Sequence, residues 1–258
     1  MHTSHKPSFT LGAQLTVDML EEDVHPIIHR LRTAEPVSWV PVLDAWFVTK
    51  RNLTIEVMRD AQTYTVDHPG FSTAQVVGSS MLSLDGTAHL RHRDPFERPF
   101  RKREVQTRFA DAVQTAVIQL LHQFKANGRA ELRRAFAGPI AVQTMIVALG
   151  IEEAEASIKS VLGWYDTIVE AVTRVSAGEP VSDAGKAAFE ALRQTLLPVL
   201  KQAPESSLLA AAAHQAGGLS DKQIISNAAV LLFGGIETTE GMIANAIFDY
   251  ITRVNEGG

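Results

Sequence analysis

Small, acidic and hydroxyl side chains stand together near the end of the sequence, in the run Gly234-Gly235-Ile236-Glu237-Thr238-Thr239. If this run is helical, its two glycines flatten one face, and a flat face suits a large planar ligand lying close to the backbone. The Thr238 hydroxyl can bond back to the carbonyl of Gly234 and loosen the turn, which leaves room for a small ligand. The alternative is a helix crossing, in which the glycines let another helix approach.

A second pair of polar residues, His89 and Arg93, lies four positions apart. In a helix this spacing places both side chains on one face. Both can donate hydrogen bonds to a carboxylate or a phosphate, so the pair is a candidate anion site. The alternative is an ordinary solvated helix face, and the pair alone does not separate the two.

The glycine run lies within a long predicted helix, residues 219–252. Ser220, followed three residues later by Gln223, forms a capping box that begins the helix. Most residues between Ile224 and Phe233 are apolar, a pattern typical of a helix in the middle of a domain. At ~1.5 Å per residue, a helix of about thirty residues spans ~45 Å, the width of a whole domain.

The rest of the chain is predicted to be mainly α-helical, with one small β-sheet piece near the N-terminus. Asp85 is expected to cap the helix that holds His89 and Arg93. Residues 62–84 are expected to form an irregular loop, which covers a site or packs on its own domain. The other expected helices are 21–32, 53–60, 106–126, 131–149 with an interruption near Gly138-Pro139, 152–177, 183–202 and a short one within 204–216; the strands are 37–40 and 45–49.

The length of 258 residues and the hydrophobic content of 45% are enough for one sizeable domain. The net charge of −5 gives no general attraction to nucleic acid or to a membrane. The sequence contains no cysteine, which excludes disulfides, thiolate metal sites and a cysteine nucleophile, and no metal ligand is assigned. It also shows no signal peptide and no apolar run long enough for a membrane span, so a cytoplasmic location is expected.

Two motifs resemble the cytochrome P450 family. The run from Gly234 to Thr239 resembles the central helix of that family, whose pattern is Ala/Gly-Gly-x-Asp/Glu-Thr. The segment from Leu84 to Arg93, continuing through Pro99-Phe100 and Arg103-Glu104-Val105, is similar to the family's His-x-x-x-Arg helix. The motifs lie about 140 residues apart and in the family's order, which makes them more specific together than singly. Pro95 departs from the pattern and is expected to kink that helix or end it early.

The resemblance implies a haem site. His89 and Arg93 would bind the haem propionates, while Gly234 and Gly235 would lie over the haem. Thr238 would help to deliver protons to the oxygen that the iron binds, and Glu237 would support that relay. The helices at 152–177 and 183–202 would form a mobile lid, and the substrate pocket would include Phe71, Met81, Leu82 and Phe233.

The implied protein is the N-terminal part of a cytochrome P450 through its central helix. It forms one incomplete domain, with a flexible start (1–17), a helix and strand piece with its loop (18–84), helices (85–218) and the central helix (219–252). The family's activity is haem-dependent insertion of one oxygen atom from O2 into an apolar organic substrate. An electron-donating reductase is the implied partner, and it would dock on a basic cluster of Arg91, Arg93, Arg98, Arg101, Lys102 and Arg103.

The family's cysteine ligand and its later Glu-x-x-Arg helix have no counterpart here. The Glu-x-x-Arg sequence does occur three times, but always before the central helix: at Glu56 to Arg59, Glu131 to Arg134 and Glu190 to Arg193. A thiolate ligand favours O–O cleavage, so the isolated chain, which has no cysteine, is expected to be inactive. Because the later part of the family's domain has no counterpart here, the chain is also expected to expose an apolar flank of the central helix. The N-terminal sequence, from Leu11 to Thr16 and from Val37 to Pro41, looks most like that of bacterial P450s fused to a flavin and iron–sulfur reductase.

Two other readings remain open at this point. One is a non-catalytic helical module that binds haem or another ligand. The other is a helical interaction protein whose motifs have no present function. Neither reading involves nucleic acid, because no aromatic residues are interleaved with the basic cluster as stacking platforms.

Overall fold

The computed structural model describes residues 9–97, 100–151, 157–202, 207–214 and 218–256. The chain forms two compact units, Met1–Thr65 and Val66–Gly258. It is mainly α-helical with one two-stranded sheet, as the sequence predicted. That both units belong to a single domain stays a prediction.

The first unit packs two helices and a hairpin around a small core of Leu15, Leu31 and Val40. Its antiparallel strands pair Trp39 with Trp46, and the turn between them places Asp44 in the left-handed region, at φ 47°. The single helix predicted over 21–32 is wrong. Two helices occur because the Asp23 side chain accepts a hydrogen bond from the His25 N–H and begins a new one. The elements are α1 (Val17–Glu22), α2 (Val24–Ala34), β1 (Val37–Val40), β2 (Ala45–Val48) and α3 (Arg51–Arg59).

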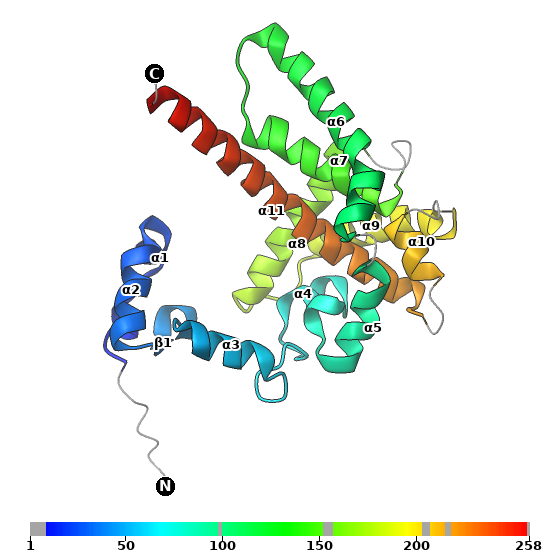
Figure 1. The fold of residues 1–258 in the computed structure, drawn as a ribbon. Coiled ribbons are helices and arrows are strands. Elements are labelled where there is room, and N and C mark those ends of the chain that lie inside the picture. The colour runs from blue at the N-terminus through cyan, green and yellow to red at the C-terminus, as the bar shows by residue number, and fades with distance from the viewer. Residues whose placement is uncertain (1–8, 98–99, 152–156, 203–206, 215–217, 257–258) are drawn as a thin grey trace. The chain divides into compact units, whose positions relative to one another are not determined.

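The second unit consists of helices, and the long helix predicted around the glycine run crosses it (Figure 1). Gly128, at φ 65°, caps the C-terminus of the helix predicted over 106–126, which the structure extends to Lys102–Asn127. The expected interruption before Gly138-Pro139 is a π-helical turn, Arg133–Ala137. The helices are α4 (Ser72–Val77), α5 (Gly86–Glu97), α6 (Lys102–Asn127), α7 (Gly138–Leu149), α8 (Ile158–Ser176), α9 (Asp183–Gln202), α10 (Leu208–Ala213) and α11 (Asp221–Glu256).

Helices α7 and α11 form the centre of this unit. The capping box is confirmed, because the Ser220 N–H donates to Gln223 Oε1 at 3.0 Å and the Gln223 N–H donates to Ser220 Oγ at 3.4 Å. The first half of α11 is buried from Ile224 to Ile236 on its core face. Its C-terminal part extends past the neighbouring helices (Figure 1), where Phe248 is 73% exposed and Tyr250 is 69% exposed. The prediction of an uncovered apolar flank is thus confirmed.

Two local predictions in this unit need correction. The loop over 62–84, predicted to be irregular, contains α4 and a 3-10 turn at Met81–Ser83. Of the two effects expected of Pro95, an early end of the helix is wrong, because α5 continues to Glu97 and a proline in the last turn removes only one bond of the ladder; a kink stays a prediction.

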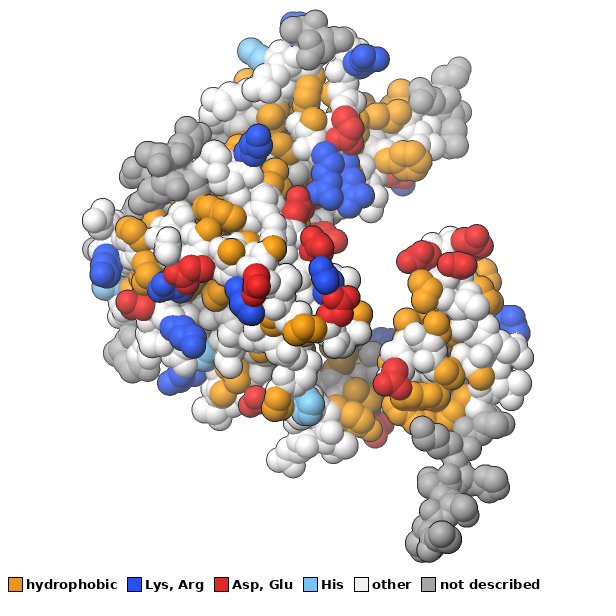
Figure 2. Space-filling model, turned by 180° about the vertical axis from the view of Figure 1, so that it is seen from behind, with side chains coloured by type: hydrophobic (Ala, Val, Ile, Leu, Met, Phe, Trp, Pro, Cys, Tyr) orange, Lys and Arg blue, Asp and Glu red, His pale blue; other side chains and the backbone are white. Residues whose placement is uncertain are grey.

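The surface mixes charged and hydrophobic side chains on the face drawn in Figure 2. Among the residues that the structure describes, no helix is both long and apolar enough to cross a lipid bilayer. Some residues that entered the sequence predictions lie outside the described residues: 1–8, Arg98, Pro99, 152–156, 204–206 and 215–216.

Candidate functional site

A cavity of about 420 Å³ lies in the second unit, within the range of roughly 300–1,000 Å³ that is usual for ligand pockets. Six predicted site residues from three separate segments meet in it: Met81 and Leu82, His89 and Arg93, and Gly234 and Gly235. Most of its wall is apolar, and its remaining lining residues are Phe100, Met145, Val230 and Leu231.

The two glycines of α11 have different surroundings. A Cβ added at Gly234 would meet no other atom within 4 Å, so this glycine leaves open space beside the helix. A Cβ added at Gly235 would lie 2.3 Å from Met145 Sδ, because α7 approaches α11 there. Both sequence interpretations are therefore realised, one at each position: a flat open face at Gly234 and a helix crossing at Gly235.

The polar end of the cavity comes from α5. The Nδ1 atom of His89 lies 2.8 Å from the carbonyl oxygen of Met81. Since a carbonyl only accepts, Nδ1 carries the hydrogen and Nε2 is left for another partner. Arg93 makes no ion pair or hydrogen bond with the residues that the structure describes. This end of the cavity can thus bind an anionic group.

Asp85 holds the loop before α5. Its Oδ2 atom accepts a hydrogen bond from the Val66 N–H at 2.9 Å and from the Asp67 N–H at 3.4 Å. Its carbonyl oxygen accepts the first backbone bond of α5, from the His89 N–H. The aspartate therefore links the start of this helix to the chain at residues 66–67, which the capping prediction did not include.

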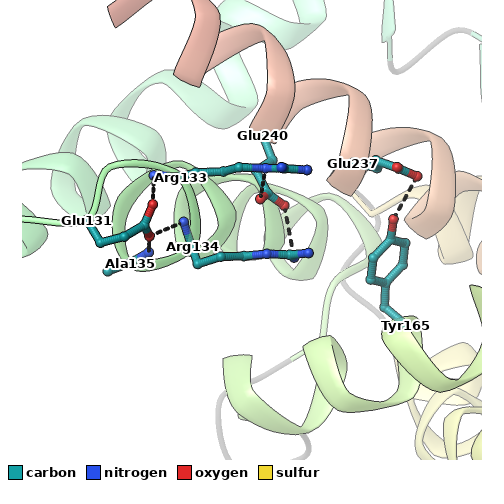
Figure 3. Close-up of polar contacts among 7 residues, drawn as sticks. All are labelled: Glu131, Arg133, Arg134, Ala135, Tyr165, Glu237 and Glu240. Atoms are coloured by element: carbon teal, nitrogen blue, oxygen red, sulfur yellow. Dashed lines mark hydrogen bonds and ion pairs between the residues drawn. The ribbon is translucent and has the colours of Figure 1, made fainter. Parts of the chain in front are cut away.

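Thr238 and Glu237 leave α11 in different directions. The Thr238 hydroxyl donates to the carbonyl oxygen of Gly234, as predicted. Consecutive residues on a helix are turned by about 100°, so Thr238 shares the side of Gly234 while Glu237 points toward α8. There the Glu237 Oε2 atom accepts a hydrogen bond from the Tyr165 hydroxyl at 3.0 Å (Figure 3).

The two predicted pocket phenylalanines are not among the residues that line this cavity. Phe233 lies on the α8 side of α11, where its ring centroid is 6.1 Å from that of Tyr165. Phe71 directly precedes α4. Contact of either ring with a substrate stays a prediction, as do the catalytic roles of Glu237 and Thr238.

Sequence reasoning missed Asn227, a buried residue of α11. Its Oδ1 atom accepts from the Met81 N–H at 2.7 Å, and its Nδ2 atom lies 3.0 Å from His92 Nδ1. Since His89 binds the Met81 carbonyl, both the backbone N–H and the backbone carbonyl of Met81 are held by side chains. Burial lowers the pKa of His92, and the charge of nearby Arg91 lowers it further. A polar residue within a long apolar run was the signal available in the sequence.

A second missed residue is Glu240, whose side chain is 2% exposed. Its two carboxylate oxygens lie 3.1 Å from Arg133 Nε and 3.5 Å from Arg134 Nη1 (Figure 3). Glu131 accepts hydrogen bonds from the backbone N–H groups of the same turn, and these bonds lower its pKa. The Glu-x-x-Arg sequence at 131–134 therefore connects the π-helical turn before α7 to α11 through the arginine contacts with Glu240. No sequence pattern pointed to this arrangement.

The Glu-x-x-Arg sequence at 190–193 forms a solvent-exposed ion pair on the surface of α9. Arg193 and Glu190 form an ion pair in which the two side chains are 39% and 46% exposed. The hydrogen bond from Arg193 lowers the pKa of Glu190 to about 2. This arrangement agrees with the expectation that such four-residue charge pairs are common on helix surfaces.

The chain is similar in sequence to bacterial cytochromes P450. The chain is 26% identical over 240 residues to Cytochrome P450 109 of Bacillus spizizenii, and 27% identical over 249 residues to Nocardicin C N-oxygenase of Nocardia uniformis. These matches cover 88% and 92% of the chain, but 56% and 61% of the relatives. The chain thus spans about 60% of the length of the curated relatives it matches. No family model matches the sequence.

Solved structures show the same likeness. P450BioI in complex with an acyl carrier protein that carries hexadec-9Z-enoic acid matches with a TM-score of 0.74 at 18% identity, over 92% of this chain and 64% of that one. CalO2 matches with a TM-score of 0.73 at 21% identity, over 93% and 62%. The chain therefore has the cytochrome P450 fold over the part that it spans, and the prediction made from the two motifs is confirmed. The cytochromes P450 that it matches are haem proteins. A fused reductase stays a prediction.

Proposed function

We propose that this chain forms one side of the haem site of a cytochrome P450 monooxygenase, which inserts one oxygen atom from O2 into an apolar organic substrate. The observation that carries the proposal is the cavity in which Arg93, His89 and Gly234 meet. Its apolar wall suits a macrocycle, and its two cationic or hydrogen-bonding side chains suit carboxylates.

The residues present fit haem on three counts. Gly234 leaves a stretch of α11 without a Cβ obstacle, so a planar group can lie close to the backbone. Arg93 is without a partner among the described residues, and its planar guanidinium matches a propionate. The Nε2 atom of His89 is left for a second carboxylate contact, because Nδ1 is fixed on Met81. When bound, haem supplies an iron that activates O2.

The residues of α11 provide the proton side of the proposed chemistry. Thr238 lies on the side of Gly234 and can exchange its present bond to that carbonyl for one to a ligand in the cavity. Glu237 is the nearest carboxylate along the chain and can return a proton to the hydroxyl. Substrate contacts from Met81 and Leu82 are consistent with their place in the cavity wall.

The axial thiolate of the family must come from residues other than these 258, because the sequence contains no cysteine. The chain by itself is therefore proposed to lack monooxygenase activity. The proposed electron donor docks on the basic cluster near α5, whose described members are all exposed: Arg91, Arg93, Arg101, Lys102 and Arg103. A cytoplasmic location is part of this proposal.

Haem titration of the purified chain tests the proposal, with absorption spectra of the oxidised and the carbon monoxide-reduced forms. We expect one haem per chain without a thiolate-type spectrum. Arg93→Ala should weaken binding by roughly tenfold to a hundredfold, since a hydrogen bond to a charged group contributes about 1.5–3 kcal/mol. Arg91→Ala is the matched control, an exposed arginine of α5 that does not line the cavity.

Two results would contradict the proposal: no stoichiometric haem binding, or equal losses in Arg93→Ala and Arg91→Ala. A thiolate-type spectrum would show that a ligand reaches the iron from elsewhere. A histidine-type spectrum with retained affinity would favour a non-catalytic haem-binding module.

A further inference from the structure

Two acidic residues of α11 are held by other helices in different ways. Glu240 is buried and meets the guanidinium groups of Arg133 and Arg134. Glu237, three residues earlier, is exposed and accepts a hydrogen bond from the phenol of Tyr165 on α8. Figure 3 shows that the two carboxylates point to separate partners. Glu240 is therefore fixed by two charges, while Glu237 is held by one neutral donor.

Tyr165 is well placed to act as a fixed donor. Tyr165 is 6% exposed, and the centroid of its ring lies 6.1 Å from that of Phe233 on α11. Burial raises the pKa of Tyr165, and the hydrogen bond to Glu237 and the charge of that carboxylate raise it further. The hydroxyl thus remains protonated across the physiological pH range and can only donate to a carboxylate in this position.

The direction of this bond matters for Thr238. Glu237 is turned about 100° around α11 from its neighbour, and Tyr165 holds Glu237 Oε2 on the α8 side. For Oε2 to approach the cavity side of α11, the bond to Tyr165 must break or α8 must shift. The position of α8 therefore decides where this carboxylate lies.

We propose that Tyr165 is a positioning residue for Glu237, through which α8 sets the distance of the Glu237 carboxylate from Thr238. The inference rests on the proposed function, because that distance matters for catalysis only if Thr238 takes part in proton delivery. Tyr165 touches neither the cavity nor a reacting atom, so it acts through Glu237 alone.

The contact can be tested without haem. The chain contains three tyrosines, and Tyr64 and Tyr250 are 53% and 69% exposed. With ¹³Cζ-labelled tyrosine, each gives one NMR resonance, assigned by its Tyr→Phe variant. At pH 7 the Tyr165 resonance should shift between the unmodified chain and Glu237→Gln, because the hydroxyl then faces a neutral acceptor, while the resonances of Tyr64 and Tyr250 stay in place. A Tyr165 resonance that does not shift, or that shifts no more than those of Tyr64 and Tyr250, overturns the proposal.

The positioning role is tested in the complete monooxygenase that contains this chain. Tyr165→Phe should lower the product formed per O2 consumed, by up to roughly a hundredfold, since misplacing a group by about 1 Å can cost that much. The same change in a Glu237→Gln background should have no further effect, whereas a purely structural role would persist there. Tyr250→Phe is the matched control on α11.

The NMR and oxygenation experiments distinguish a failure of the proposed function from a failure of this inference. If the Tyr165 resonance depends on Glu237 but no haem binding or oxygenation is found, the proposed function fails while the contact stands. If oxygenation is found but Tyr165→Phe acts equally with and without Glu237, Tyr165 is only a structural residue and the inference is overturned. If Tyr165→Phe does not fold, Glu237→Asp provides a second test, because its shorter side chain moves the acceptor away from the Tyr165 hydroxyl. The Tyr165 resonance should then shift, and an unchanged resonance counts against the proposal.

Discussion

The adjacent glycines of α11 allow a paired substitution that separates the two roles of the glycine run. Gly234→Ala and Gly235→Ala make the same chemical change one residue apart in the same helix. In a helix interior, alanine is more favourable than glycine by roughly 0.8–1 kcal/mol. Any difference between the variants therefore reports the surroundings of each Cβ and not its helix propensity.

The structure predicts that only one of the two substitutions stabilises the chain. The new methyl group at residue 234 meets nothing within 4 Å, so Gly234→Ala should stabilise the chain by about 1 kcal/mol. At residue 235 the methyl group would lie 2.3 Å from Sδ and 2.8 Å from Cγ of Met145, which is 5% exposed, so the Met145 side chain must shift. Overpacking costs typically about 1–3 kcal/mol, so the net effect is between neutral and about 2 kcal/mol destabilising.

Urea unfolding followed by circular dichroism measures both variants. For a unit of this size, 1 kcal/mol corresponds to a shift of about 2–4 °C in Tm, which a thermal scan resolves. Met145→Ala removes the clashing side chain, so Gly235→Ala should become stabilising in that background. The reasoning is refuted if Gly235→Ala stabilises as much as Gly234→Ala, or if the Met145→Ala background leaves its effect unchanged.

Two further predictions concern the buried polar groups. Replacing both Arg133 and Arg134 by alanine leaves the buried Glu240 carboxylate without its cations and should cost about 1–3 kcal/mol, because the two arginines are themselves 58% and 60% exposed. Glu240→Gln should cost less in urea unfolding, since it removes the charge; a larger loss in Glu240→Gln would contradict this. Because burial lowers the pKa of His92, the unfolded chain binds more protons than the folded one below pH 6.5. Stability should therefore fall as pH drops through 6.5 toward the lowered pKa, and His92→Gln should reduce that slope in unfolding measured at pH 7.5 and 5.5.

Much of the local structure follows from neighbouring residues and was predictable. The Ser220 and Gln223 capping box, the Thr238 bond to Gly234 and the helix end at Gly128 all join residues at most four positions apart. Their geometry is fixed by the helix itself, whatever packs around it. The order and spelling of the two motifs also predicted the cytochrome P450 fold, which the relatives and solved structures confirmed.

Two predictions of helix positions were wrong, because the periodic pattern of apolar residues does not show side-chain hydrogen bonds to the backbone or very short helices. Asp23 divides one predicted helix into two, because its side chain satisfies a backbone N–H that a continuous helix would have used. Short helical turns were missed within 62–84, since six residues are too few for a clear period.

The pairing of side chains between helices was decided only by tertiary structure. The bonds from Tyr165 to Glu237, from Arg133 to Glu240 and from Met81 to Asn227 join residues 72, 107 and 146 positions apart. A helical pattern tells which face is buried, but not which residue of which other helix will lie against it. The approach of Met145 to Gly235 has the same origin. The sequence therefore predicted where the two motifs lie in the helices, while packing decided which of their residues face the cavity and which partners hold the others.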